Sequence, residues 1–112
     1  MAYEFISVER EGPVTIFTLN RPEVMNAVHS PMHFEMDEAF NAFNADPEQW
    51  VGIITGAGER AFSAGNDLKN QATGGSMAMP ASGFAGLAQR FDLNKPLIAA
   101  VNGVAMGGGF EI

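Results

Sequence analysis

Hydrophobic and polar residues alternate in the first part of the chain, a pattern typical of half-buried β-strands. The alternation runs imperfectly from Tyr3 to Glu11 and more regularly from Val14 to Leu19, with Gly12-Pro13 between the two runs. Because Gly-Pro favours a turn, the two runs predict a hairpin of two strands. The residues that follow, from Asn20 to about Val28, predict a loop.

A helical spacing of apolar residues begins after this loop. Ser30-Pro31 predicts the start of a helix, because serine caps helix N-termini and proline fits the first helical position. The apolar positions of the predicted helix are Met32, Met36, Ala39, Phe40 and Phe43. Asp46-Pro47 predicts its end, since a residue before proline disfavours helical backbone. We expect the apolar stripe to face the core rather than a ligand.

The pattern then returns to strands. Val51 to Thr55 predicts a short buried strand, and strand, helix and strand in this order predict a right-handed crossover with parallel pairing. Asn70 to Gly83 is rich in Gly, Ser, Ala and Met and predicts an irregular segment. Phe84 to Phe91 predicts a short helix, and Leu97 to Val101 a further buried strand. The predicted fold class is therefore α/β.

Length and composition narrow the class of protein. With 112 residues and 46% hydrophobic content, the chain is long enough for one domain with a core. It has neither the roughly 18 consecutive apolar residues of a membrane span nor a basic segment ahead of an apolar one, so neither a span nor a signal peptide is expected. The net charge of −7 argues against a nucleic-acid partner. The lack of cysteine excludes disulfides and thiolate chemistry and is compatible with the cytoplasm, where we expect the protein.

The chain contains two histidines, His29 and His33, which stand four residues apart. Such a pair can share one face of a helix. Since there is no further histidine and no cysteine, we expect a solvated pair and no metal site.

The last eleven residues, Asn102 to Ile112, contain four glycines within seven positions. Glycine permits positive φ and the close approach of another molecule to the main chain. A helix that begins near Gly108 leaves its first N–H groups unpaired, which suits a phosphate, a carboxylate or a developing oxyanion. Glu111 follows within one turn and adds a carboxylate. The alternative is a tight turn from strand to helix with no ligand.

A second glycine motif, Gly56-Ala57-Gly58-Glu59-Arg60-Ala61, fits the G-x-G-x-x-A pattern of dinucleotide-binding loops. That fingerprint also requires a helix next and an acidic residue about twenty positions further on. Phe62 to Asn66 has more turn formers than helix formers, and no acid lies between Asp67 and Asp92. We therefore predict a turn, and a dinucleotide-dependent oxidoreductase is the less favoured alternative.

The segment Ser63 to Lys69 indicates a ligand site when it is considered together with the terminal glycines. Both segments follow predicted parallel strands, where α/β folds place their ligands. Gly65 permits a turn that aims the Asn66 N–H into a pocket, so the N–H groups of Asn66 and Gly108 are expected to converge on one carbonyl oxygen. Two such donors stabilise an enolate or a tetrahedral oxyanion.

Five segments together carry a resemblance to a known family. They are Leu19-Asn20-Arg21-Pro22, Met25-Asn26-Ala27, Ile54-Thr55-Gly56, Phe62-Ser63-Ala64-Gly65-Asn66-Asp67-Leu68, and Ala100-Val101-Asn102-Gly103 with Gly107-Gly108-Gly109-Phe110-Glu111. In order and spacing the chain resembles the N-terminal part of the enoyl-CoA hydratase/isomerase (crotonase) superfamily. The resemblance implies a spiral of β-β-α units, usually assembled as trimers or pairs of trimers. We accordingly expect residues 1–112 to form the N-terminal portion of a single crotonase-like core domain, with the chain ending inside the helix that opens near Gly108.

The resemblance also implies roles for catalytic residues. The backbone N–H groups of Asn66 and Gly108 would form the oxyanion hole for the thioester carbonyl. Asn66 stands where many relatives have Ala, which changes little because the backbone acts. Glu111 matches the first of the two glutamates used by hydratases, and the second would lie beyond Ile112.

Binding roles for coenzyme A follow from the same resemblance. Met25, Asn26 and Ala27 match a loop that lies along CoA, and Ala64 matches a backbone contact to its adenine. Lys69 matches a basic position near the CoA phosphates, although an exposed lysine also serves solubility. CoA is part of the substrate, so no separate cofactor is expected.

The predicted function is hydration of a 2-enoyl-CoA through a thioester enolate. Enoyl-CoA isomerisation or another crotonase-type reaction is the alternative within the superfamily. If the chain is not an enzyme, the alternative is an inactive fragment or an interaction module. The expected partners are an acyl-CoA thioester and further copies of the protein, with neither nucleic acid nor membrane.

Overall fold

The computed structural model of the protein describes residues 3–112. Its strands are β1 (Ile6–Glu11), β2 (Val14–Leu19), β3 (Val51–Gly56), β4 (Ala61–Ser63), β5 (Leu97–Ala99) and β6 (Val104–Ala105). Its α-helices are α1 (Ser30–Ala45), α2 (Leu68–Ala72) and α3 (Gly108–Glu111), and single 3-10 turns form at Pro22–Val24 and Phe84–Gly86. No helix among these residues is long and apolar enough to cross a membrane.

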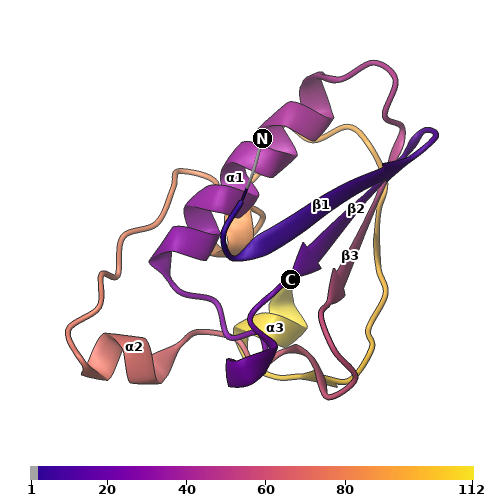
Figure 1. Ribbon diagram of the computed structural model, residues 1–112. Helices are drawn as coiled ribbons and strands as arrows, with labels where there is room; N and C mark the ends of the chain where they lie inside the picture. The colour runs from indigo at the N-terminus through magenta and orange to yellow at the C-terminus, as the bar shows by residue number, and fades with distance from the viewer. Residues whose placement is uncertain (1–2) are drawn as a thin grey trace.

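Four strands form the main sheet in the order β1-β2-β3-β5. β1 and β2 pair antiparallel, whereas β2 with β3 and β3 with β5 pair parallel. The predicted hairpin and the predicted parallel pairing across the helix are thus confirmed. A second, two-stranded parallel sheet of β4 and β6 was not predicted. α1 lies across one face of the main sheet, while α2 and α3 lie near the end of the sheet where β2 and β3 terminate (Figure 1).

The core lies between α1 and the main sheet. Its fully buried side chains come from β2 (Phe17 and Leu19) and from the predicted stripe of α1 (Met32, Met36 and Phe40), with Phe43 almost as deeply buried. The Phe17 ring packs on those of Phe40 and Phe43 at centroid distances of 4.5 and 5.5 Å. The predicted role of the stripe is confirmed.

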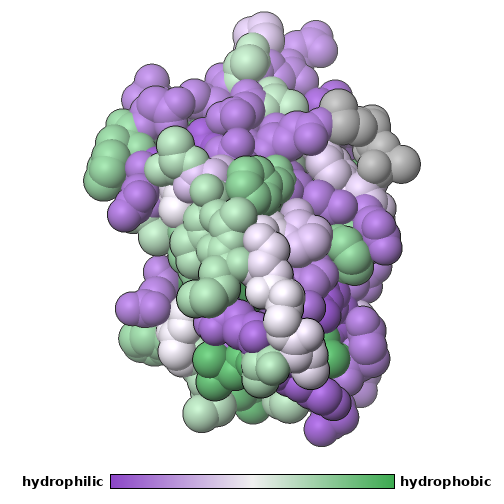
Figure 2. Space-filling view, turned by 90° about the vertical axis from the view of Figure 1, so that its left-hand side faces the viewer, coloured by the Kyte–Doolittle hydropathy of each residue, from purple (hydrophilic) through white to green (hydrophobic). Residues whose placement is uncertain are grey.

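The N-terminus of α1 differs from the prediction at one residue. His29, not Ser30, is the N-cap residue, and it makes no side-chain capping bond. Ser30 is instead the first helical residue, and its hydroxyl donates to the carbonyl oxygen of Ala78 at 2.7 Å. The serine therefore fastens the irregular 73–83 segment to the helix. Figure 2 shows the face on which this segment lies, and hydrophobic residues gather in the middle of that face.

The predicted helix from Phe84 to Phe91 is wrong beyond its first turn. Ala85 has a φ of +56° and a ψ of +21°, and the glycines at positions 83 and 86 also have positive φ. Three left-handed residues within four positions end the regular helix, and Phe91 is left 92% exposed.

The predicted burial of the Leu97–Val101 strand is also wrong. β5 forms and pairs with β3, but Ile98 is 54% and Val101 58% exposed. β5 is an edge strand of the sheet, with a strand neighbour on one side only among the described residues, and Val101 lies beyond its end.

Candidate active site

The loop between β2 and α1 has an unusual backbone at Met25 and Asn26, both with φ of +56°. The buried Asn26 side chain stabilises this turn: its amide nitrogen donates to the carbonyl oxygens of Ala57 and Ala61, and its Oδ1 accepts from the Arg21 N–H. The loop is also bonded to the segment after β4, because the Ala64 N–H donates to the Met25 carbonyl at 3.0 Å. Two of the predicted CoA-binding residues, Met25 and Ala64, are therefore joined by a hydrogen bond. The Asn26 side chain forms its hydrogen bonds within the protein.

A partly buried ion pair connects the same loop to the start of α2. The Arg21 guanidinium contacts the Asp67 carboxylate at 2.9 Å and also donates to the carbonyl of Ala27. Burial raises the pKa of Asp67, but the Asn70 N–H bond and the bond and charge of Arg21 outweigh it, so the pKa lies below its ordinary value. Asp67 caps α2 through that Asn70 bond, whereas Lys69, the predicted phosphate contact, is exposed on the helix.

Gly65 and the terminal glycines lie against each other. A Cβ added to Gly65 would lie 2.7 Å from the Met106 carbonyl oxygen and 2.9 Å from the Gly108 nitrogen. Gly65 also has a φ of +93°, so its lack of a side chain serves both backbone conformation and close approach. Gly107, the residue before α3, needs its φ of +53°, and a Cβ on Gly108 would lie 2.6 Å from the Phe84 ring.

The two predicted oxyanion donors lie on these touching segments. Within residues 3–112, neither the Asn66 nor the Gly108 N–H donates a hydrogen bond. The Asn66 segment is held in place from both sides, because the Val28 N–H donates to the Gly65 carbonyl and the Asp67 N–H donates to the Val28 carbonyl. An oxyanion site requires two free N–H groups held close together, and the two segments offer such groups on adjoining backbone.

Glu111, the predicted acid–base residue, lies exposed at the wall of a cavity of about 380 Å³. The other lining residues are Phe84, Leu87, Ala88 and Ile112. Phe84 also contacts Gly108, so one aromatic ring links the donor to the cavity that holds the carboxylate. A carboxylate beside an apolar cavity can activate a water molecule against an apolar substrate.

Sequence reasoning missed the role of Phe84, Leu87 and Ala88. Their spacing predicts a short helix, whereas in the structure they line the cavity beside Glu111. The preceding irregular segment, from Asn70 to Gly83, contributes to a narrow cavity beside Asn66. No local pattern reports the contact of Phe84 with a glycine 24 positions away.

The histidine pair is buried, so the prediction of a solvated pair is wrong. His29 is 8% and His33 2% exposed, because both lie at the start of α1 beneath other segments. The His29 ring packs edge-on against Phe5 at 4.4 Å, and His33 Nδ1 accepts from the Ala85 N–H at 2.8 Å. No cluster of three metal-ligating side chains occurs in the described part of the chain.

The Gly56–Ala61 motif forms a turn, as predicted. Strand β4, rather than a helix, follows it. The turn is stabilised by Asn102, whose Oδ1 accepts from the Gly56 N–H and whose amide donates to the Gly58 carbonyl. Without a helix N-terminus to face a pyrophosphate, the motif lacks the geometry of a dinucleotide site.

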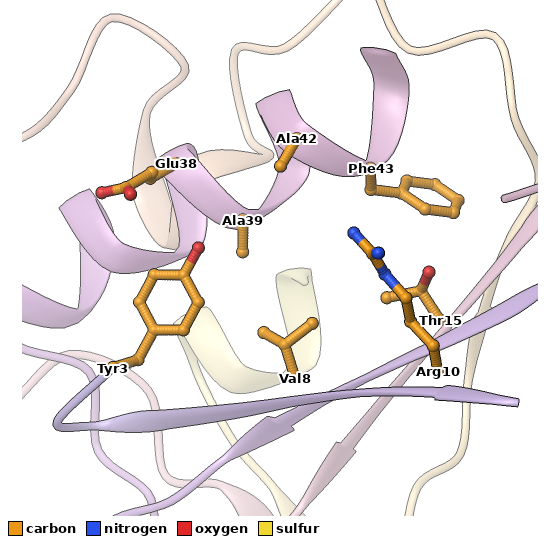
Figure 3. A pocket seen from close by; sticks show the side chains of 8 residues that line it. All are labelled: Tyr3, Val8, Arg10, Thr15, Glu38, Ala39, Ala42 and Phe43. Carbon is orange, nitrogen blue, oxygen red and sulfur yellow. The ribbon is translucent and has the colours of Figure 1, made fainter. Parts of the chain in front are cut away.

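A separate cavity of about 410 Å³ lies between α1 and the β1–β2 hairpin (Figure 3). Val8 and Ala39 form its apolar centre, Tyr3 points toward Glu38 at one end, and Arg10 extends into the other. Burial, together with the carboxylates of Glu38 and Glu35, raises the pKa of Tyr3. None of the predicted site residues lines this cavity, so it is separate from the candidate site at Glu111 and the two N–H groups.

Comparison with known proteins identifies the family: a model of the enoyl-CoA hydratase/isomerase family matches residues 9–112, and the chain belongs to that family. A carnitinyl-CoA dehydratase from Salmonella arizonae is 52% identical over 111 residues, which are 97% of this chain and 42% of that protein. The match confirms the resemblance to the crotonase superfamily, and this chain spans less than half the length of that relative.

Solved structures show the same relationship. The crystal structure of carnitinyl-CoA hydratase from Mycobacterium avium superimposes with a TM-score of 0.90 at 42% identity, over 98% of this chain and 43% of that one. An enoyl-CoA hydratase from Bacillus anthracis gives a TM-score of 0.81 at 34% identity, over 96% of this chain and 43% of that one. The observed fold is thus the N-terminal portion of the crotonase fold.

Because of this partial coverage, the experiments below use a chimera. It is the Salmonella arizonae dehydratase in which these 112 residues replace the aligned first part. At 52% identity over the aligned part, we expect the chimera to keep the shared fold.

The buried His33 predicts a pH-dependent stability. Burial and the neighbouring His29 lower the pKa of His33 from 6.5 to about 4. The unfolded chain therefore binds more protons than the folded chain between these two values, and stability is lost as the pH falls from about 6.5 to about 4. The loss attributable to this residue should reach about 3 kcal/mol.

Urea unfolding of the chimera at pH 7 and at pH 4.5 measures this loss. His33→Asn, which keeps an acceptor near Nδ1 but does not titrate, should lose less stability over the same range. Equal losses in the two proteins would show that His33 does not cause the pH dependence.

Proposed function

We propose that this chain supplies the oxyanion hole and one acid–base carboxylate of an enzyme that adds water across the double bond of a 2-enoyl-CoA thioester. One observation carries the proposal. The free N–H groups of Asn66 and Gly108 lie on touching segments, and Phe84 joins one of them to the cavity that holds Glu111.

In this reaction Glu111 accepts a proton from water as its oxygen bonds to C3 of the substrate. The electron pair of the C2=C3 double bond moves toward the thioester oxygen, where the N–H groups of Asn66 and Gly108 stabilise the enolate. Protonation at C2 then completes the addition, with the proton supplied by an acid on the same face. The reverse direction is dehydration of a 3-hydroxyacyl-CoA.

The coenzyme would lie along Met25, Asn26 and Ala27, with its adenine at the Ala64 backbone and its phosphates near Lys69. The bond between Ala64 and Met25, together with the exposure of Lys69, supports this placement. CoA enters as part of the substrate, and no other cofactor is proposed. We also propose that the complete enzyme forms trimers or pairs of trimers.

The names of the relatives make carnitinyl-CoA a specific candidate for the hydroxyacyl substrate. Enoyl-CoA isomerisation is the second candidate function. Isomerisation uses the same enolate, so both reactions need the N–H groups of Asn66 and Gly108. It needs no attacking water, so Glu111 would not activate water as it does in hydration.

A direct assay tests the proposal. The chimera should hydrate a short 2-enoyl-CoA, followed by the loss of the conjugated thioester absorbance, and should interconvert carnitinyl-CoA with its dehydrated form. Shift of a double bond without uptake of water would favour the isomerase. A folded chimera that turns over neither substrate would contradict the proposed function.

A further inference from the structure

His33 is a buried polar side chain outside the proposed reaction. It lies on α1 and is 2% exposed. Its Nδ1 accepts a hydrogen bond of 2.8 Å from the Ala85 N–H, and its ring contacts that of Phe84 edge-on at a centroid distance of 4.7 Å. His33 does not line the cavity at Glu111, and with Asn66 it lines a separate narrow cavity that residues 76–79 also line.

The segment that receives this bond is held in a conformation that L-residues rarely adopt. Ala85 has a φ of +56°, and a Cβ on Gly86 would lie 2.7 Å from the backbone nitrogen of Asp37 on α1. At the far end of the segment, the Arg90 guanidinium donates to the Gly86 carbonyl and pairs with Asp37 at 2.8 Å. Such a strained turn persists only where surrounding contacts determine it, and the His33 bond holds the residue next to Phe84.

Phe84 transmits this placement to the active site. Its ring lies directly on the Cα of Gly108, since a Cβ there would be 2.6 Å from the ring. The same ring lines the cavity of about 380 Å³ with Leu87, Ala88 and Glu111. A shift of the Ala85 backbone would therefore change the width of the cavity beside the proposed oxyanion donor.

We infer that Phe84 determines which acyl groups the cavity accepts, and that His33 is the positioning residue that holds Phe84 against Gly108. This inference rests on the proposed function. The substrate class it concerns is the 2-enoyl-CoA thioesters, distinguished by the length and bulk of the acyl chain. Misplacement of a group by about 1 Å can cost on the order of 100-fold in turnover, so a positioning residue outside the site can affect catalysis.

The first arm of the test replaces the ring. Phe84→Ala in the chimera should raise the ratio of kcat/KM for long over short 2-enoyl-CoA substrates by about tenfold or more, the range expected when an apolar pocket gains space. Phe84→Leu, which keeps a smaller apolar side chain, should shift the ratio less. It provides the test if the Phe84→Ala variant does not fold. Phe91→Ala is the matched control, since Phe91 belongs to the same segment but is 92% exposed. An unchanged ratio in both Phe84 variants would overturn the assignment of Phe84.

The second arm separates the effect of the hydrogen-bond acceptor of His33 from the effect of its size. His33→Leu removes the acceptor, and we expect about a tenfold lower kcat, a nearly unchanged KM and the same broadened chain-length preference as in Phe84→Ala. His33→Asn restores an acceptor close to the place of Nδ1 and should bring kcat to within about threefold of the parent. Identical values for the two variants would overturn the positioning role.

A measurement that needs no turnover accompanies both arms. Hydrogen exchange of the Ala85 amide should be slow in the parent chimera and in His33→Asn, and at least about tenfold faster in His33→Leu. A parent chimera without hydratase activity but with this exchange pattern would refute the proposed function while supporting the role of His33. An active parent in which the Ala85 amide exchanges equally in all three proteins would refute the role of His33 alone.

Discussion

Glu111→Gln in the chimera should lower the turnover of a short 2-enoyl-CoA by a factor on the order of 10²–10⁴, with acyl-CoA binding close to that of the parent. Glutamine keeps the shape and the hydrogen-bonding reach of the side chain but cannot take the proton of the attacking water. Because glutamine and glutamate have nearly the same volume, the replacement should leave packing at the cavity wall unchanged. Steady-state hydration and acyl-CoA titration measure the two effects separately.

Glu9→Gln is the matched control, because Glu9 is an exposed carboxylate on β1 and contacts no predicted site residue. It should leave turnover unchanged. If Glu111 only complements the dipole of α3, its replacement should cost no more than about 0.3–1 kcal/mol of stability and leave turnover intact. Unchanged turnover with a lowered melting temperature would therefore refute the catalytic role.

Gly65→Ala should reduce both turnover and stability. Its Cβ would meet the Met106 carbonyl and the Gly108 nitrogen, which are backbone atoms that cannot rotate away. The two segments would have to separate, and loss of one oxyanion donor typically lowers kcat by about 10²–10³-fold. The free energy of unfolding should fall by roughly 1–3 kcal/mol from overpacking, in addition to the cost of a φ of +93° for alanine.

Gly74→Ala separates the two causes. Gly74 has a φ of +87°, close to that of Gly65, but no atom lies within 4 Å of its added Cβ. Its replacement should cost only the backbone part of the stability loss and leave kcat unchanged. Kinetics and urea unfolding of both variants give the comparison, and equal effects at the two positions would contradict a functional contact between Gly65 and Gly108.

Local patterns predict the first half of the fold well. The hairpin depends on alternation and on Gly12-Pro13, and the helix on an apolar stripe with a proline at each end. Each of these features acts between residues close in sequence, and the structure contains all of them. Parallel pairing of β2 with β3 follows from their order along the chain.

The second half depends on contacts that no local pattern contains. The backbone at Ala85 bonds to His33 across 52 positions, and this bond favours a left-handed turn over the helix that Phe84 to Phe91 predicts. The sequence around His29 and His33 does not indicate that they are buried, because the segments that cover them come from distant parts of the chain. At the site, the glycines could be recognised as points of close approach, but Phe84 as their partner could not.

The left-handed pair Met25 and Asn26 bears on how coenzyme A would bind. Their loop is held in this conformation by the buried Asn26 amide and by the Arg21–Asp67 pair. A nucleotide that lies along such a preorganised loop loses little affinity to the conformational entropy of the protein. Differences in affinity among acyl-CoA substrates should then arise in the acyl portion, and the shared coenzyme should contribute a nearly constant free energy to each.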